Sequence, residues 1–332
     1  MARKLTPGEV SIEVRLTRDD LRAALKHDVR AGLAGDPKTL RPIWFYDDRG
    51  SQLYRQIAAL EEYYPCRTER ELLAGWADDI AEMAGGTVLV ELGTDSSETT
   101  GLLLDGMADS TAGLAGYVPF DMTEAALRQA AAAVARSRDI GVHAVVGDLH
   151  RHLEAVPDVG APRLFTLLGR RIGNLVPAQR RELLGEIGLV LDPDDRILLA
   201  TDLVKPVDRL LSAYDDAQGL TADLNRNLLT MLNRELGADF APDRFAHVAV
   251  WDDEACWVEM RLRATEDMVV AIPGVDMVVE FACGEDLRTE VGAKFRPDQV
   301  GEELAEAGMA VVDRWIDPAG DYLLTLARPV RK

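Results

Sequence analysis

The residues with the clearest chemical meaning lie where an apolar run ends in an acid and a glycine, with small polar residues after them. A strand is expected over 87–92, Gly93 follows it, and a helical pattern begins at Gly101. In doubly wound α/β folds, a nucleotide-like ligand lies against such a turn and against the N-terminus of the next helix. This turn has one glycine where such loops carry several, and it has Asp95 where a ligand needs close approach to the backbone. The segment therefore predicts a cofactor-binding enzyme whose cofactor turn is altered.

Alternating strands and helices must hold this turn in place. Helices are expected over 68–83, 101–107, 123–136 and 177–191, and strands over 87–92, 116–121, 142–148, 163–169 and 196–202. This alternation predicts a mostly parallel sheet with right-handed crossovers. Two later strands, over 310–317 and 322–328, are joined by a tight turn and form a hairpin, so at least one strand is antiparallel. A parallel sheet closed by such a hairpin is typical of methyltransferases that use S-adenosylmethionine (SAM).

The chain is expected to fold as two discontinuous domains. The segment between the fifth strand and the hairpin is too long for a structureless loop, and it holds a helical block over 207–236 with β-like stretches after it. We therefore expect an α/β domain, a class I SAM-methyltransferase-like Rossmann sheet of seven strands, built from residues 68–204 and 294–332. The second, an α+β substrate-binding domain, is expected to combine residues 1–67 with 205–293.

Composition limits the partners of the chain. Its 332 residues carry a formal net charge of −20, which argues against nucleic acid or an anionic membrane as the main partner, because phosphates are repelled. The three cysteines have no metal-like spacing, and His150 and His152 lack further ligands, so no metal is expected. The sequence shows no apolar targeting core and no membrane-spanning stretch. We therefore expect a cytoplasmic monomer whose partner is a small molecule.

Several short segments recur in the order typical of one enzyme family. They are Trp44-Phe45-Tyr46-Asp47, Glu62-Tyr63-Tyr64-Pro65, Arg67-Thr68-Glu69, Glu91-Leu92-Gly93, Pro119-Phe120-Asp121, Gly147-Asp148, Ile172-Gly173-Asn174, Thr201-Asp202-Leu203-Val204-Lys205, Tyr214-Asp215-Asp216, Asn225-Arg226-Asn227 and Lys294-Phe295. Together they resemble the histidine Nα-methyltransferase family of ergothioneine biosynthesis, from residue 20 onward. The resemblance implies a SAM-binding methyltransferase domain and a second domain that binds the amino acid.

The resemblance also implies roles for individual residues. Tyr63 and Glu290 would contact the substrate side chain, Asn174 the α-amino group and Tyr214 the α-carboxylate. Asn174 and Tyr214 are thus the expected catalytic residues. The expected substrate-binding set also includes Met260, Gly292, Arg170 and Arg171. The residues expected to line the cofactor pocket are Tyr46, Gly93, Thr94, Thr99, Asp121 and Asp148.

Two of these acids can also be interpreted from their positions alone. Asp121 ends the second strand, where an acid accepts hydrogen bonds from ribose hydroxyls, and Asp148 ends the third strand, near the place of an adenine amino group. The alternative is that both acids only cap the helices that follow them.

The cofactor turn departs from the family at two positions. The family has glycine at position 95 and lysine at position 99, whereas this chain has Asp95 and Thr99. The lysine would pair with the carboxylate of SAM, and a lost charged hydrogen bond costs about 1.5–3 kcal/mol. The substitutions therefore predict weakened or even lost SAM binding.

Two further departures bear on the substrate. Arg170 and Arg171 stand where the family has small polar residues. One of them could replace the missing lysine, occupy the pocket or bind a different anionic group; alternatively, both are solvated residues at a helix start. Gly292 replaces a serine that in the family helps Glu290 to hold the imidazole, so a wider pocket with one donor fewer is expected, and histidine is an uncertain substrate.

Three functions are compatible with these residues. The sequence favours a SAM-dependent N-methyltransferase that acts on the amine of a histidine-like amino acid or a derivative in small-molecule biosynthesis. The alternative is a repurposed member of the fold that binds an anionic amino-acid-derived substrate and catalyses a non-methylating reaction in specialised metabolism. A non-catalytic partner protein ranks last, because the residues for an amino-acid head group are present.

Overall fold

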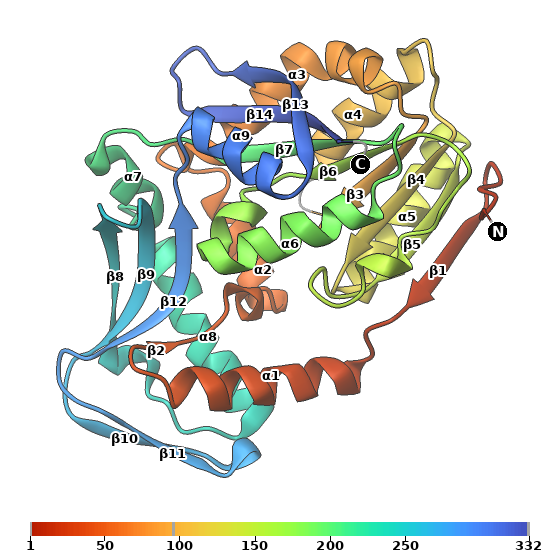
Figure 1. Ribbon diagram of the computed structural model, residues 1–332. Coiled ribbons are helices and arrows are strands. Elements are labelled where there is room, and N and C mark those ends of the chain that lie inside the picture. The colour runs from red at the N-terminus through yellow and green to blue at the C-terminus, as the bar shows by residue number, and fades with distance from the viewer. Residues whose placement is uncertain (1, 95–96, 331–332) are drawn as a thin grey trace. The chain divides into compact units, whose positions relative to one another are not determined.

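The computed structural model describes residues 2–94 and 97–330 and divides into two compact units (Figure 1). Unit 1 consists of the segments Met1–Thr17, Arg67–Leu203 and Phe295–Lys332. Unit 2 consists of Arg18–Cys66 and Val204–Lys294. Both units are therefore discontinuous in sequence.

Unit 1 is built around an eight-stranded sheet. Its strands, in spatial order, are β1 (Val10–Val14), β5 (Gly141–Val146), β4 (Gly116–Asp121), β3 (Val88–Leu92), β6 (Arg163–Leu167), β7 (Arg196–Asp202), β14 (Tyr322–Pro329) and β13 (Met309–Ile316). The first six strands run parallel, whereas β14 is antiparallel to both of its neighbours. Strands β3, β5 and β6 are buried along their whole length, as expected for parallel strands that are covered on both faces.

The strand order of unit 1 reverses between β3 and β6. The chain places β4 and β5 on one side of β3, and it then returns to place β6 and β7 on the other side. In open α/β sheets a ligand binds outside the carboxyl ends of the strands at such a switch point. The turn after β3 and the loop after β6 are therefore the segments of unit 1 best placed to bind one.

Helices pack on this sheet and supply most of the rest of the core of unit 1. They are α3 (Tyr64–Ala84), α4 (Ser97–Asp109), α5 (Glu124–Arg138), α6 (Pro177–Val190) and α9 (Pro297–Glu306), with short 3₁₀ turns η2 (Leu153–Ala155) and η3 (Arg171–Asn174). Leu73 and Ile80 of α3, Leu104 of α4 and Leu127 of α5 are buried in one cluster with Leu89 of the sheet. The apolar stripe of each helix thus faces the apolar strands, which is the arrangement expected for an α/β fold.

The N-terminal segment corrects the expected domain division. Residues 1–67 were expected to belong together, but β1 pairs in parallel with β5, so residues 1–17 belong to unit 1 and the sheet has eight strands instead of seven. Alternation of side chains over 10–14 gives the period of a strand. Because β1 is a half-exposed edge strand, no continuous apolar run marks it.

Unit 2 combines a four-stranded sheet with helices from both of its segments. The sheet order is β2 (Lys38–Thr39), β12 (Asp286–Ala293), β9 (Trp257–Ala264) and β8 (Phe245–Asp252), antiparallel except for the β2–β12 pair. Strands β10 (Met268–Ile272) and β11 (Met277–Phe281) form a separate hairpin. The helices are α1 (Arg18–Leu33), α2 (Asp48–Ile57), α7 (Val207–Tyr214) and α8 (Leu220–Leu236), with short 3₁₀ turns η1 (Pro42–Phe45), η4 (Pro242–Arg244) and η5 (Pro273–Val275).

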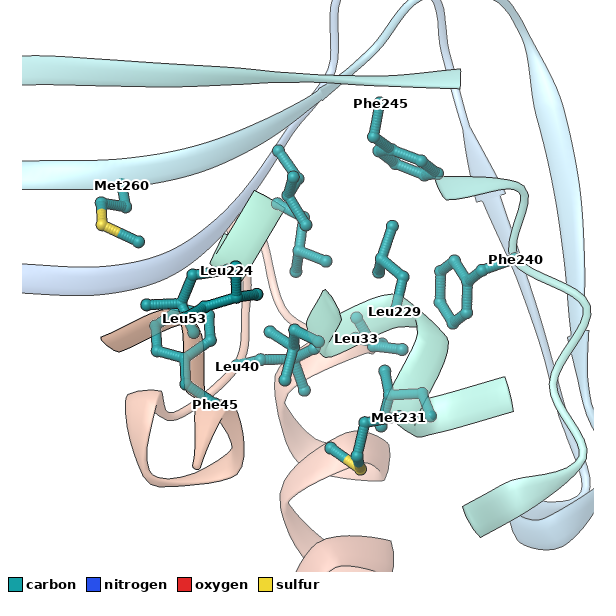
Figure 2. Packing of buried hydrophobic residues seen from close by; sticks show 14 of the residues in the cluster. Leu33, Leu40, Phe45, Leu53, Leu224, Leu229, Met231, Phe240, Phe245 and Met260 are labelled. Carbon is teal, nitrogen blue, oxygen red and sulfur yellow. The ribbon is translucent and has the colours of Figure 1, made fainter. Parts of the chain in front are cut away.

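The core of unit 2 is made by both of its segments. Figure 2 shows side chains from the first segment, such as Leu33 and Phe45, packed near Leu224 and Leu229 of α8. Residues 18–66 thus bury apolar surface that residues 204–294 alone would leave exposed, which explains why unit 2 needs both segments.

Two searches of the described part of the chain were negative. Among residues 2–94 and 97–330, no helix has the length and apolar character needed to cross a membrane. The same residues contain no group of three or more His, Cys, Asp or Glu side chains placed to hold a metal ion.

Candidate functional site

The turn after β3 is fastened to the end of the neighbouring strand β4. Gly93 has a φ of +86°, a conformation that residues with a side chain rarely adopt, and its N–H donates to the Phe120 carbonyl at 2.7 Å. The N–H and the hydroxyl of Thr94 donate to Oδ2 of Asp121, at 3.1 and 3.2 Å. The expected cofactor residues Gly93, Thr94 and Asp121 therefore lie together at the switch point.

The buried carboxylate of Glu91, two residues before Gly93, links the elements next to the turn. Glu91 accepts a hydrogen bond from the Thr100 hydroxyl at 2.6 Å and another from the Tyr117 hydroxyl. Burial, followed by the charge of Glu91, raises the pKa of Tyr117 well above its usual value, so the phenol stays protonated and keeps donating. Glu91 thus joins β3, β4 and α4. Thr99, an expected cofactor residue that precedes Thr100 in α4, is also buried. Asp95 lies outside the described residues.

Asp121 and Asp148 close short local turns at their strand ends. The Thr123 N–H donates to Oδ1 of Asp121, and the His150 N–H donates to Oδ1 of Asp148, both at 2.9 Å. Such bonds to the N–H two residues later are Asx turns and not helix caps, because the N-cap residues are Thr123 for α5 and His152 for η2. His152 accepts a hydrogen bond from the Asp148 N–H at 3.1 Å and so belongs to the same turn.

Arg171 lies on the cofactor turn. A Cβ built on Gly93 would stand 2.6 Å from the Arg171 Cδ and still closer to its guanidinium, so the side chain covers the open face of that glycine. Its Nη2 donates to the Thr94 carbonyl at 2.9 Å and is 3.5 Å from Oδ2 of Asp121. The residue therefore reaches from the loop after β6 to the ends of β3 and β4.

Arg170 has a different environment from Arg171. It has a φ of +60° and is buried, and its charge acts on the phenol of Tyr322, whose hydroxyl donates to Glu69 at 2.7 Å. Burial and then the charge of Glu69 raise the pKa of Tyr322, and Arg170 acts in the opposite direction. The interpretation of both arginines as solvated helix-start residues is wrong, because one is buried and the other covers Gly93.

Asn174 ends η3 close in sequence to Arg171. Its amide oxygen Oδ1 is buried and has no hydrogen-bond partner among the residues that the structure describes. A buried acceptor without a donor is unfavourable by about 1–3 kcal/mol unless a ligand or water satisfies it. This atom is therefore the strongest sign of a ligand position in unit 1.

In unit 2, Tyr214 and Lys294 form a buried pair over Gly292. The Lys294 ammonium donates to the Tyr214 hydroxyl at 2.9 Å, and a Cβ built on Gly292 would overlap that hydroxyl. The glycine was expected to widen the side-chain pocket. That expectation is wrong at this point, because the tyrosine hydroxyl occupies the volume where a side chain at position 292 would begin.

The other expected substrate residues of unit 2 lie on two strands and in the aromatic segments. Glu290 faces Met260 across the β9–β12 ladder, and both are buried. A bulge between Arg288 and Glu290 shifts the register there; such bulges often redirect a side chain.

The expected aromatic residues Tyr46 and Tyr63 both pack edge-on against Tyr54. Tyr63 packs edge-on against Tyr54, with ring centroids 6.2 Å apart, and Tyr54 packs edge-on against Tyr46 at 5.5 Å. The interpretation of the aromatic segments as packed side chains thus holds alongside any role in binding.

Sequence reasoning missed several side chains that hold the motif residues in place. Lys294 was noted only within a family segment, although it is 2% exposed and fixes Tyr214. Asp47 accepts from Asn227 at 2.8 Å and thereby links two motifs of unit 2. The motifs did not indicate that Lys294 pairs with Tyr214 or Asn227 with Asp47, since these partners are far apart in the sequence.

Comparison with known proteins gives the family. A family model of histidine-specific, SAM-dependent methyltransferases matches residues 25–329. The chain is 48% identical over 319 residues to the histidine N-alpha-methyltransferase of Mycolicibacterium smegmatis, covering 96% of this chain and 99% of that protein. It is 44% identical to the protein of the same description in Mycobacterium tuberculosis, with the same coverage. It is 26% identical to the N-methyltransferase imqF of Aspergillus flavus, over 96% of this chain and 88% of that protein.

These findings confirm the resemblance seen in the sequence, the α/β fold class and the assignment as a methyltransferase. They give no support to the non-methylating alternative, since each of the three relatives is named as a methyltransferase. The chain belongs to the histidine-specific, SAM-dependent methyltransferase family.

Proposed function

We propose that the enzyme transfers a methyl group from SAM to the α-amino nitrogen of histidine, or of a closely related amino acid, in a biosynthesis of the ergothioneine type. Family membership supports the reaction class. The observation that carries the proposal is the buried Oδ1 of Asn174, which lacks a hydrogen-bond donor among the described residues. An N–H of the substrate amine would satisfy it.

The residues of unit 1 fit an adenosyl cofactor. Gly93 offers a backbone surface without a Cβ, and Asp121 and Asp148 follow adjacent parallel strands, which suits ribose hydroxyls and an adenine amino group. When bound, SAM would supply the methyl group on a sulfonium, from which the neutral thioether S-adenosylhomocysteine is a good leaving group. Gly93, Thr94, Asp121 and Asp148 would hold it, with Thr99 close to the turn.

The task of the protein is to present a neutral amine in the correct orientation, since only the neutral nitrogen has a lone pair for the attack. Oδ1 of Asn174 would accept one N–H and thereby fix the direction of that lone pair. Tyr214, held by Lys294, would donate its hydroxyl proton to the substrate carboxylate. We assign the substrate side chain to Tyr63, Met260, Glu290 and the backbone at Gly292.

The test is a methylation assay with histidine and a panel of other amino acids, read by mass spectrometry. We expect methylated histidine with the wild type, and a fall in kcat/KM of about 10- to 100-fold for Asn174→Ala. The amine gains positive charge as it attacks the methyl group, so its hydrogen bond to Asn174 becomes charge-assisted in the transition state. The thermal midpoint of unfolding should not fall, because Oδ1 has no partner to lose among the described residues. Absence of methyl transfer to every amine in the panel would refute the proposal.

We also propose that this chain binds SAM more weakly than relatives with a lysine at position 99. Thr99 has no positive charge, and Asp95 adds a negative one. Asp95→Gly combined with Thr99→Lys should lower the dissociation constant of SAM about tenfold or more in calorimetric titration. A wild type that binds in the low micromolar range and is unchanged by the double substitution would contradict this reasoning.

A further inference from the structure

The loop after β6 brings one positive charge to the switch point of unit 1. Gly93 and Thr94 follow β3, Asp121 ends β4, and the side chain of Arg171 contacts all three residues. A ligand that lies against the backbone of Gly93 must therefore meet the guanidinium. A ribose hydroxyl directed at Asp121 must share that carboxylate with Arg171.

The present contacts of Arg171 with the turn are easy to exchange. The nitrogen–oxygen distance to Asp121 is 3.5 Å, and the arginine side chain is 35% exposed, so solvent screens the pair. Oδ2 of Asp121 already accepts two hydrogen bonds from Thr94. A carboxylate on a ligand can instead take two parallel hydrogen bonds from the planar guanidinium, which is the stronger geometry.

We propose that Arg171 binds the carboxylate of the amino-acid end of SAM, for which its side chain must exchange its contacts with the Gly93–Thr94 turn. This inference rests on the proposed function, because it assumes an adenosyl cofactor. It chooses between the possibilities that the sequence left open. Arg171 replaces the missing lysine only in part, because it must first give up its contacts with Gly93 and Thr94, so SAM binding stays weaker than with a lysine at position 99.

Arg170 is not an equivalent candidate. It is buried and acts on the Tyr322 phenol, next to the hydrogen bond from Tyr322 to Glu69. The adjacent arginines thus have separate roles, and the proposal predicts different results when each is changed.

Two adenosyl thioethers test the proposal without any methyl transfer. S-adenosylhomocysteine carries the carboxylate, and 5′-methylthioadenosine has the same adenosine and sulfur without the amino-acid end. Calorimetric titration of both compounds compares the wild type, Arg171→Met and Arg171→Lys. Arg181→Met is the matched control, because Arg181 is an exposed residue of α6 that pairs with Glu306.

We expect Arg171→Met to weaken S-adenosylhomocysteine binding about 10- to 100-fold, while 5′-methylthioadenosine binds unchanged or more tightly because the turn is uncovered. Arg171→Lys should lose less, since it keeps the charge and loses the planar fork. Arg181→Met should change neither affinity.

Each other outcome overturns the inference. Equal tightening of both compounds in Arg171→Met would mean that Arg171 only obstructs the turn. Equal weakening would mean that it only holds the turn in shape, and no change would mean that it takes no part in binding. If neither compound binds any variant, the proposed cofactor fails as well, which separates that result from failure of the inference alone.

Discussion

The contact between Tyr214 and Gly292 allows a quantitative test of unit 2. A Cβ at position 292 would lie 2.7 Å from Cζ of Tyr214 and 3.1 Å from its Cε1, and closer still to the hydroxyl oxygen. Moving the tyrosine aside would cost free energy, because it is buried and its hydroxyl accepts a hydrogen bond from Lys294. Gly292→Ala should therefore overpack the site and lower the free energy of unfolding by about 1–3 kcal/mol. No left-handed backbone strain adds to this, since Gly292 is not among the residues with positive φ.

The partner substitution should be costly alone but should relieve part of the overlap. Tyr214→Phe removes the acceptor of a buried ammonium, which costs about 1.5–3 kcal/mol. It also removes the hydroxyl oxygen, which is the atom nearest to the new methyl group, while Cζ stays 2.7 Å away. The double variant should therefore be more stable than the sum of the single effects predicts, by about 1 kcal/mol.

Thermal unfolding followed by circular dichroism measures this coupling. For a domain of roughly 150–250 residues, 1 kcal/mol corresponds to about 2–4 °C in the midpoint. The control is Gly185→Ala on α6, where a Cβ would meet no atom within 4 Å among those described. If Gly292→Ala is as harmless as the control, or if the two effects simply add, the tyrosine hydroxyl does not occupy that volume.

Two further predictions concern pH. Burial lowers the pKa of His247 below 6.5, so the unfolded chain binds the proton before the folded chain does as the pH falls through 6.5. The thermal midpoint should therefore fall on acidification. His247→Gln should remove the part of this decrease that comes from His247. Arg263 and Arg261 hold the pKa of Asp286 below 3.8, so the ionised carboxylate stabilises the folded chain above that pH and loses this effect below it. Asp286→Asn should lower the thermal midpoint at neutral pH and make the midpoint less dependent on pH in acid. Unaltered pH profiles in these variants would contradict the respective assignments.

The sheet of unit 1 was predictable because its central strands are buried on both faces. Such strands read as unbroken apolar runs, and β3 to β7 lie close to the expected ranges. The hairpin of β13 and β14 was marked by its tight turn. The edge strand β1 lacks a continuous buried face, and its pairing with β5 bridges a large sequence separation, so the domain division near the N-terminus was wrong.

The positions of the candidate site residues in unit 1 followed from topology. The carboxyl ends of parallel strands share one edge of a sheet, which brings Gly93, Asp121, Asp148 and the loop before Asn174 to the same edge. What the sequence could not supply was the direction of individual side chains. The register shift before Glu290, for example, depends on how β12 pairs with β9, and no residue type in that segment predicts this shift.

The same difficulty explains why Gly292 was misleading. A glycine in the sequence suggests open space, and at Gly292 we expected a wider pocket. In the structure, however, a large side chain from another segment covers the missing Cβ at both places: Arg171 at Gly93 and Tyr214 at Gly292. The absence of a side chain therefore decides only that something else can approach the backbone. Which group approaches, and whether a ligand can displace it, depends on the contacts that hold it. Arg171 has a screened ion pair to Asp121, whereas Tyr214 is fastened by a buried lysine. We therefore expect cofactor binding to move Arg171 more readily than substrate binding moves Tyr214.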